Sequence, residues 1–156
     1  MPAGGCWRNG CGIEGRSVTA SHLVIGIGNP LRGDDGIGAL LAEQVGGRCV
    51  QQLTPELAAE LAELEAVLFI DAWLAPAGAV PRITAISPAA GAAESHRLEP
   101  AQLLAISQAL YGRTPEAHLL QVPATLFEHG NALSAEIQAA LPQARELLRS
   151  WLARHA

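Results

Sequence analysis

Two carboxylates and one imidazole stand at positions where a folded α/β chain could bring them together. The chain contains only three aspartates, Asp34, Asp35 and Asp71, and all its other acidic residues are glutamates. Glutamate is the better helix former, so the sparing use of aspartate suggests that the shorter carboxylate is needed where it occurs. His96 lies in a segment rich in small residues. Together, Asp35, Asp71 and His96 would form an O,O,N set that suits a first-row divalent ion with open coordination positions, Ni²⁺ among them.

The first two aspartates follow a glycine-rich turn, GIGNPLRGDDG, at residues 26–36. Its glycines permit a sharp exit from a strand. It is not a dinucleotide fingerprint, because Leu31 replaces the third glycine of GxGxxG and two carboxylates would repel a pyrophosphate at the helix start. Helix capping explains one of the two carboxylates, and we assign that role to Asp34. Asp35 would then face the crevice as an ionised ligand.

Each of the other candidates also has an ordinary structural explanation. Asp71 could cap the turn after its strand, and His96 taken alone could be an unremarkable surface or packed histidine. His118 and His129 are further possible ligands that we interpret as structural. No GxSxG motif and no Cys/His nucleophile arrangement is visible.

Composition excludes several classes of protein. The net charge is −5 and all ten cations are scattered arginines, so the basic face of a nucleic-acid binder is missing. No apolar run approaches the ~18–20 residues that span a bilayer, and no signal segment opens the chain, so we expect a cytoplasmic protein. The three cysteines show no CxxC spacing, which indicates neither a zinc site nor a disulfide framework.

Short apolar runs typical of strands alternate along the chain with segments whose apolar residues recur at helical spacing. We predict strands at 22–28, 49–53, 66–71, 82–87 and 118–122, and helices at 34–45, 55–64, 100–110 and 134–154. This order predicts a three-layer α/β/α sandwich with one twisted, mainly parallel five-stranded sheet. The link before strand 82–87 is too short for a helical crossover, so that strand should be antiparallel. Pro142 should kink or split the last helix.

The domain is expected to comprise residues 21–156. Residues 1–20 lack periodicity and are interpreted as a disordered lead-in or a start upstream of the native frame. Ligands of such sheets bind at the carboxyl ends of strands, where the connections change sides. The first strand would deliver Asp35 to that edge and the third would deliver Asp71, so we expect these two strands to be neighbours.

Three segments resemble the hydrogenase maturation proteases in sequence, order and spacing. They are GIGNPLRGDDGIG at 26–38, LFIDAW at 68–73 and SHRLEPAQLL at 95–104. The phrases at 52–61 and 110–134 resemble the branch that serves bidirectional, NAD-linked hydrogenases. The likeness extends from about Leu23 to the C-terminus. It implies one sheet flanked by helices and removal of a C-terminal extension from the large-subunit precursor of a nickel–iron hydrogenase after nickel insertion.

By position, Asp35, Asp71 and His96 match the metal-contacting and catalytic residues of that family. The nickel is expected to arrive with the precursor and not to be a resident cofactor, and the enzyme is expected to be a monomer. Some relatives have an aspartate where this chain has Gln52. Two alternatives remain: a non-catalytic nickel carrier with the same ligands, and a peptidyl-tRNA hydrolase-like enzyme, which would need a basic cleft and a Tyr and His-Asn pair after the turn.

Overall fold

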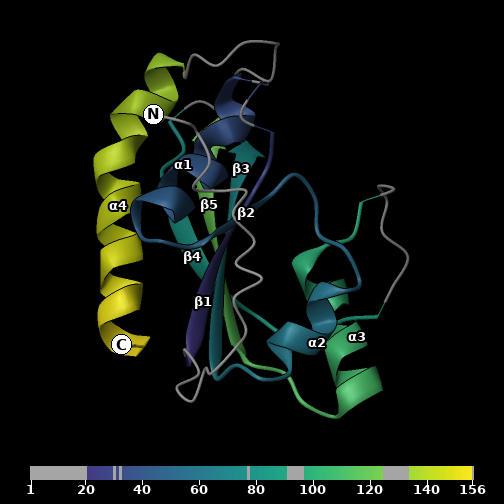
Figure 1. Ribbon diagram of the computed structural model, residues 1–156. Coiled ribbons are helices and arrows are strands. Elements are labelled where there is room, and N and C mark those ends of the chain that lie inside the picture. The colour runs from purple at the N-terminus through teal and green to yellow at the C-terminus, as the bar shows by residue number, and fades with distance from the viewer. Residues whose placement is uncertain are drawn as a thin grey trace, which may run out of the picture.

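A five-stranded mixed sheet organises the chain in the computed structural model (Figure 1), which describes residues 21–29, 31, 33–76, 78–90, 97–124 and 134–155. The strand order is β2-β1-β3-β5-β4. Four strands run parallel, and their bounds are β1 His22–Ile27, β2 Arg48–Val50, β3 Ala66–Leu74 and β5 Glu116–Ala124. The fifth, β4 (Arg82–Ile86), pairs antiparallel with β5. This confirms the predicted mainly parallel sheet with one antiparallel strand.

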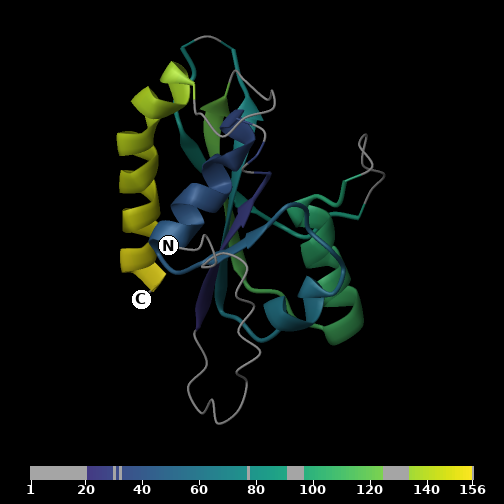
Figure 2. The ribbon, with the colours of Figure 1, turned by 45° about the horizontal axis from the view of Figure 1, so that its top comes forward.

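Helices cover both faces of the sheet, as Figures 1 and 2 show. Helices α1 (Ile37–Gln44) and α4 (Ala135–His155) lie on one face, and α2 (Leu57–Leu61) and α3 (Pro100–Tyr111) lie on the other. Successive residues of a strand point to opposite faces, so Leu68 and Ile70 of β3 pack toward α1 and α4, while Val67 and Phe69 pack toward α2 and α3. The predicted three-layer α/β/α sandwich is therefore confirmed.

Several element boundaries differ from the predictions. The turn of 3₁₀ helix η1 (Gly33–Gly36) precedes α1 and contains the two adjacent aspartates. Helix α2 begins at Leu57, because residues 54–58 first form a turn in which the amide of Leu57 donates to the carbonyl of Thr54. Strand β3 continues past Asp71 to Leu74, because β5 pairs with it along all nine residues.

The C-terminal helix α4 is one continuous helix that contains Pro142. Proline lacks the amide hydrogen that bonds the preceding turn, yet the expected split does not occur. Ile137, Ala144, Leu148 and Trp151 are all buried against the sheet, on both sides of the proline. Within the described part of the chain, none of the helices combines the length and the apolar composition needed to cross a bilayer.

Candidate active site

The two central strands β1 and β3 create the point where the sheet's connections change sides. The chain passes from β1 through α1 to β2 on one side, and then through α2 to β3 on the other side of β1. The carboxyl ends of β1 and β3 therefore border the crevice in which ligands bind in such sheets. Asp35 follows β1, and Asp71 lies on β3 where that strand extends beyond its pairing with β1. The predicted neighbours are confirmed.

Close packing of the start of α1 onto both strands holds this arrangement together. A Cβ added at Gly38 would lie 2.5 Å from the carbonyl oxygen of Ile70 on β3 and 2.6 Å from that of Ile27 on β1. No larger residue fits without displacing backbone, so glycine lets the helix approach both strands at once. The aspartates just before Gly38 are thereby held against the carboxyl edge of the sheet.

Asp35 is almost fully buried, with 7% of its surface exposed. Its Oδ2 accepts a hydrogen bond of 2.9 Å from the backbone N–H of Asn29, which closes the glycine-rich turn. Gly28 has a φ of +134°, and an added Cβ would lie 2.0 Å from the carbonyl oxygen of Asp35. The turn therefore needs glycine at this position both for its backbone conformation and for its space.

Asp71 is a carboxylic acid with a strongly altered acidity. Burial raises the pKa of Asp71 from the usual 3.8 to about 7, and the nearby charges of Asp35 and Glu99 act in the same direction. The bond from the backbone N–H of Ala72 to its Oδ1, at 2.8 Å, and the charge of Arg97 oppose this shift in pKa. Asp35 and Asp71 are thus electrostatically coupled, as two carboxylates at one site are expected to be.

Asp34 has a structural role, and it contacts the residue that precedes α4. Its carboxylate is completely buried and accepts bonds of 2.6 Å from both the backbone N–H and the hydroxyl of Ser134. Ser134 precedes α4, and its hydroxyl also accepts from the amide of Ile137. The N-cap of α1 is Gly36, which has no side-chain cap, and Asp34 anchors the start of α4 to η1.

The third predicted ligand, His96, lies outside the described residues, as does His129. Their positions remain predictions. The charges of Arg97 and Glu99, which follow His96 closely in the sequence, both act on the pKa of Asp71. The segment that follows His96 therefore approaches the site. Sequence reasoning missed both residues, although their nearness to His96 was an available signal. Trp73 packs against Arg82, with 3.9 Å between its ring centroid and the guanidinium carbon of Arg82.

This geometry can bind a cation or transfer a proton. Perturbed acidity in a crevice is typical of functional sites. A carboxyl with a pKa near 7 can donate or accept a proton at neutral pH. A cation beside Asp35 and Asp71 would offset the repulsion between them and favour the ionised form of Asp71. Oxygen ligands supplied by only two side chains leave coordination positions open for a substrate.

The fold is similar to that of several solved hydrogenase maturation enzymes. The endopeptidase HybD of Escherichia coli aligns with a TM-score of 0.66 at 20% identity over 85% of this chain and 92% of its own. HybD of Thermococcus kodakarensis, a [NiFe] hydrogenase maturation protease, aligns with a TM-score of 0.63 at 20% identity, over 83% of this chain and 97% of its own. The [NiFe] hydrogenase maturation protease HycI of the same organism aligns with a TM-score of 0.62 at 21% identity, over 85% of this chain and 92% of its own.

The resemblance is one of fold. No family model matches the sequence, and no curated protein matches it.

Proposed function

We propose that this chain is an endopeptidase that removes the C-terminal extension of a nickel–iron hydrogenase large-subunit precursor. The observation that carries the proposal is the meeting of Asp35 and Asp71 at the switch point of the sheet, in a fold shared with hydrogenase maturation endopeptidases. The motifs at 26–38, 68–73 and 95–104 give the same reading from the sequence. Fold likeness alone would not carry an activity, because one fold can serve many functions.

We further propose that the nickel belongs to the precursor. Asp35, Asp71 and His96 would supply an incomplete ligand set, so that binding requires the ligands already attached to the nickel in the precursor. A precursor without nickel would offer nothing for these residues to hold and would be ignored. The bound ion would polarise the scissile carbonyl or the attacking water. The chain's own contribution is to position that ion with two anchored carboxylates.

The anchoring of each carboxylate suits it to this task. The amide of Asn29 orients Asp35, and the amide of Ala72 orients Asp71. Burial raises the pKa of Asp71 and makes this carboxyl costly to ionise in the absence of a cation. The affinity of this carboxylate for a positively charged centre is correspondingly increased.

We also propose that the enzyme works in the cytoplasm as a monomer and serves the bidirectional, NAD-linked type of hydrogenase.

The direct test is incubation with nickel-loaded and nickel-free precursor, with the precursor's length measured by mass spectrometry. We expect shortening of the loaded form alone. Asp35→Asn and His96→Ala should abolish cleavage while circular dichroism remains native. Glu63→Gln, on an exposed residue remote from the site, is the matched control and should cleave normally. Cleavage of the nickel-free precursor would disprove nickel recognition, and normal processing by Asp35→Asn would disprove the site.

Calorimetry with free Ni²⁺ separates the enzyme from a nickel carrier. An enzyme that depends on the precursor's own ligands should bind free Ni²⁺ weakly at the carboxyl edge. A carrier with the same residues would bind it tightly without any precursor. Tight binding that is lost in Asp71→Asn, together with no cleavage of loaded precursor, would favour the carrier.

A further inference from the structure

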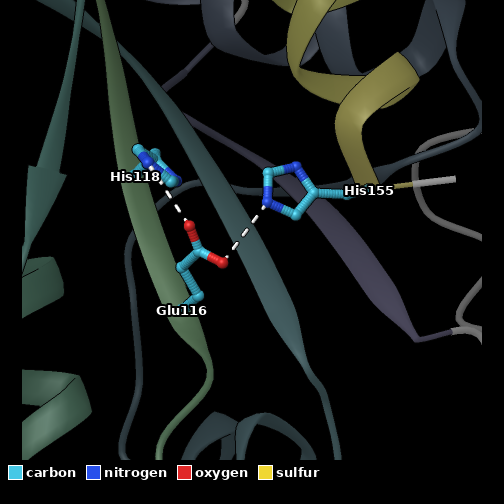
Figure 3. A group of neighbouring side chains, drawn as sticks. All are labelled: Glu116, His118 and His155. Carbon is cyan, nitrogen blue, oxygen red and sulfur yellow. Dashed lines mark ion pairs between the residues drawn. The ribbon is translucent and has the colours of Figure 1, made fainter.

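A second group of potential metal ligands lies at the opposite edge of the sheet from Asp71. Glu116 and His118 are at the start of β5, and His155 is at the end of α4. Figure 3 shows both imidazole rings directed toward the Glu116 carboxylate, which lies between them. We call these three residues the base cluster. None of the residues assigned to the proposed active site belongs to it.

Local structure explains why the three side chains converge. Residues two apart on a strand point to the same face of the sheet, so Glu116 and His118 both project toward the face that α4 covers. His155 is four residues after Trp151 and shares its side of the helix. Trp151 is completely buried against the sheet, and it therefore places the last turn of α4 over the start of β5.

Distances within the base cluster are close to those of a ligand set. His118 Nε2 lies 3.9 Å from one carboxylate oxygen of Glu116, and His155 Nε2 lies 3.6 Å from the other. One ligand atom from each residue lies within 4.8 Å of the other two. Ligands at about 2.0–2.2 Å from one zinc-like ion are roughly 3.3 Å apart, so modest side-chain movement would suffice. The side chains of His118 and His155 are only 15% and 14% exposed.

His155 is already oriented as a metal-binding histidine. Its Nδ1 lies 2.8 Å from the carbonyl oxygen of Trp151, so this nitrogen donates its hydrogen and Nε2 retains its lone pair in the neutral ring. Its ring also stacks on that of Trp151, with centroids 4.3 Å apart. A backbone carbonyl that holds the distal N–H is the usual outer support of a metal-ligating histidine.

A polar cavity adjoins the base cluster and leaves room for an ion and its water. Its volume is about 250 Å³, and Glu116 and His155 line it together with Ser21, Glu65, Ala66 and Arg154. Glu65 adds a second carboxylate to its wall. Arg154 adds a positive charge, which opposes the binding of a cation.

We propose that the base cluster binds one first-row transition-metal dication of the zinc class, through Nε2 of His118 and His155 and the carboxylate of Glu116. Two imidazoles and a carboxylate favour Zn²⁺, Ni²⁺ or Cu²⁺ over hard ions such as Mg²⁺. Burial lowers the pKa of His118, which keeps this ring neutral as a ligand must be. The site is independent of the proposed protease activity.

Binding must change the hydrogen bonding of Trp151. In the metal-free protein the indole N–H donates to Nδ1 of His118 at 3.1 Å, which places the hydrogen of the neutral His118 ring on Nε2. Coordination through Nε2 moves that hydrogen to Nδ1 and displaces the indole N–H. The loss of this one hydrogen bond is small beside the coordination of a dication by three side chains. The indole therefore reports on occupancy.

The test is titration of the full chain with Zn²⁺ by calorimetry at pH 7.5, with Mg²⁺ as the hard-ion comparison. Asp71→Asn is the background, so that the carboxyl edge does not contribute. We expect one Zn²⁺ per chain, no heat with Mg²⁺, and weaker Zn²⁺ binding at pH 5.5, where protons compete for the imidazoles. His155→Ala and Glu116→Gln should each weaken binding at least about 30-fold. Arg154→Gln should bind at least as tightly as its parent.

His22→Gln is the matched control, because His22 also packs against Trp151, with centroids 5.8 Å apart, without belonging to the base cluster. It should retain full affinity. In ¹H–¹⁵N NMR spectra, Zn²⁺ should shift the indole N–H resonance that Trp151→Phe removes. Absence of binding, retained affinity in His155→Ala, or an unmoved indole resonance would each overturn the proposal, even if precursor cleavage is confirmed.

Discussion

At the scale of single residues, Asp71 makes the protein's stability depend on pH. Burial raises its pKa from 3.8 to about 7, so between these values the folded state binds more protons than the unfolded state. The free energy of unfolding must then fall as pH rises through that window. Because the carboxyl is partly covered, we expect Asp71→Asn to be more stable than the wild type by about 1–3 kcal/mol at pH 8 and nearly equal at pH 4.

Urea denaturation of metal-free protein at the two pH values measures this difference. Comparing the two proteins at each pH cancels the contributions of the other titrating groups. An Asp71→Asn variant whose advantage does not change between pH 4 and pH 8 would contradict the raised pKa of Asp71.

Gly28 offers a second test at the residue scale. Its φ of +134° and the 2.0 Å approach of a Cβ to the Asp35 carbonyl make Gly28→Ala both strained and sterically blocked. We expect a loss of more than about 2 kcal/mol in unfolding free energy. Gly112→Ala is the control, because Gly112 has a φ of +71° with no atom within 4 Å of its added Cβ. It should cost only about 1 kcal/mol. Equal losses would show that space around Asp35 is unimportant.

Sequence reasoning anticipated some of these residues and not others. Asp35 and Asp71 were predictable because each follows or ends an apolar run, and the carboxyl ends of neighbouring parallel strands meet. The bond of Asp34 to Ser134 was not predictable, because a contact across a hundred residues leaves no local pattern. The approach of Arg97 and Glu99 to Asp71 depends on the course of a connecting segment, which periodicity does not specify.

At the scale of elements, the contact between η1 and α4 depends on one carboxylate and one hydroxyl amino acid. Asp34→Ala would leave the amide of Ser134 without its acceptor in a buried setting, and we expect a loss of about 2–4 kcal/mol. Ser134→Ala removes only the hydroxyl and should cost about 1–2 kcal/mol. A double-mutant cycle measured by denaturation should give a coupling of at least 0.5 kcal/mol. Strict additivity would show that the bond between the Ser134 hydroxyl and the Asp34 carboxylate contributes nothing to stability.

Pro142 lies inside helix α4, where the sequence alone predicts an interruption of the helix. It interrupts the backbone hydrogen bonding of α4 on an exposed position. Pro142→Ala restores an amide donor, and we expect it to raise the unfolding free energy by about 1–3 kcal/mol. Gln143→Ala, on the neighbouring exposed position, should change stability by less than about 0.5 kcal/mol. A destabilised Pro142→Ala variant would mean that the proline positions the helix.

The elements themselves were largely predictable, but their lengths were not. Apolar runs and helical stripes located all five strands and the two long helices. Packing keeps α4 from splitting at Pro142, because buried residues on both sides of it hold the two halves of α4 to the same face. Strand β3 gained three residues from its pairing with β5. Pairing between distant strands and burial against a sheet are tertiary effects that lie outside any local window.

At the scale of the whole molecule, the sheet separates two polar sites. Asp71 pairs with Gln121 of β5, and Glu116 lies five residues earlier on that strand, which corresponds to roughly 17 Å. Substitutions this far apart are expected to act independently. We therefore expect His155→Ala to leave the cleavage rate of loaded precursor within about twofold of the wild type. Single-turnover assays of the two proteins test this, and a loss beyond tenfold would show that the sites communicate.

The bond between Asp34 and Ser134 also has a consequence for biosynthesis. About a hundred residues must be added after Asp34 before Ser134 exists, which takes a ribosome roughly 5–20 seconds. Once Asp71 has been added, the nascent chain contains both carboxylates of the proposed site but not yet the helix that secures the segment beside them. The carboxyl edge would thus be completed only after Ser134 has been added, which would keep a shorter nascent chain from acting on other proteins.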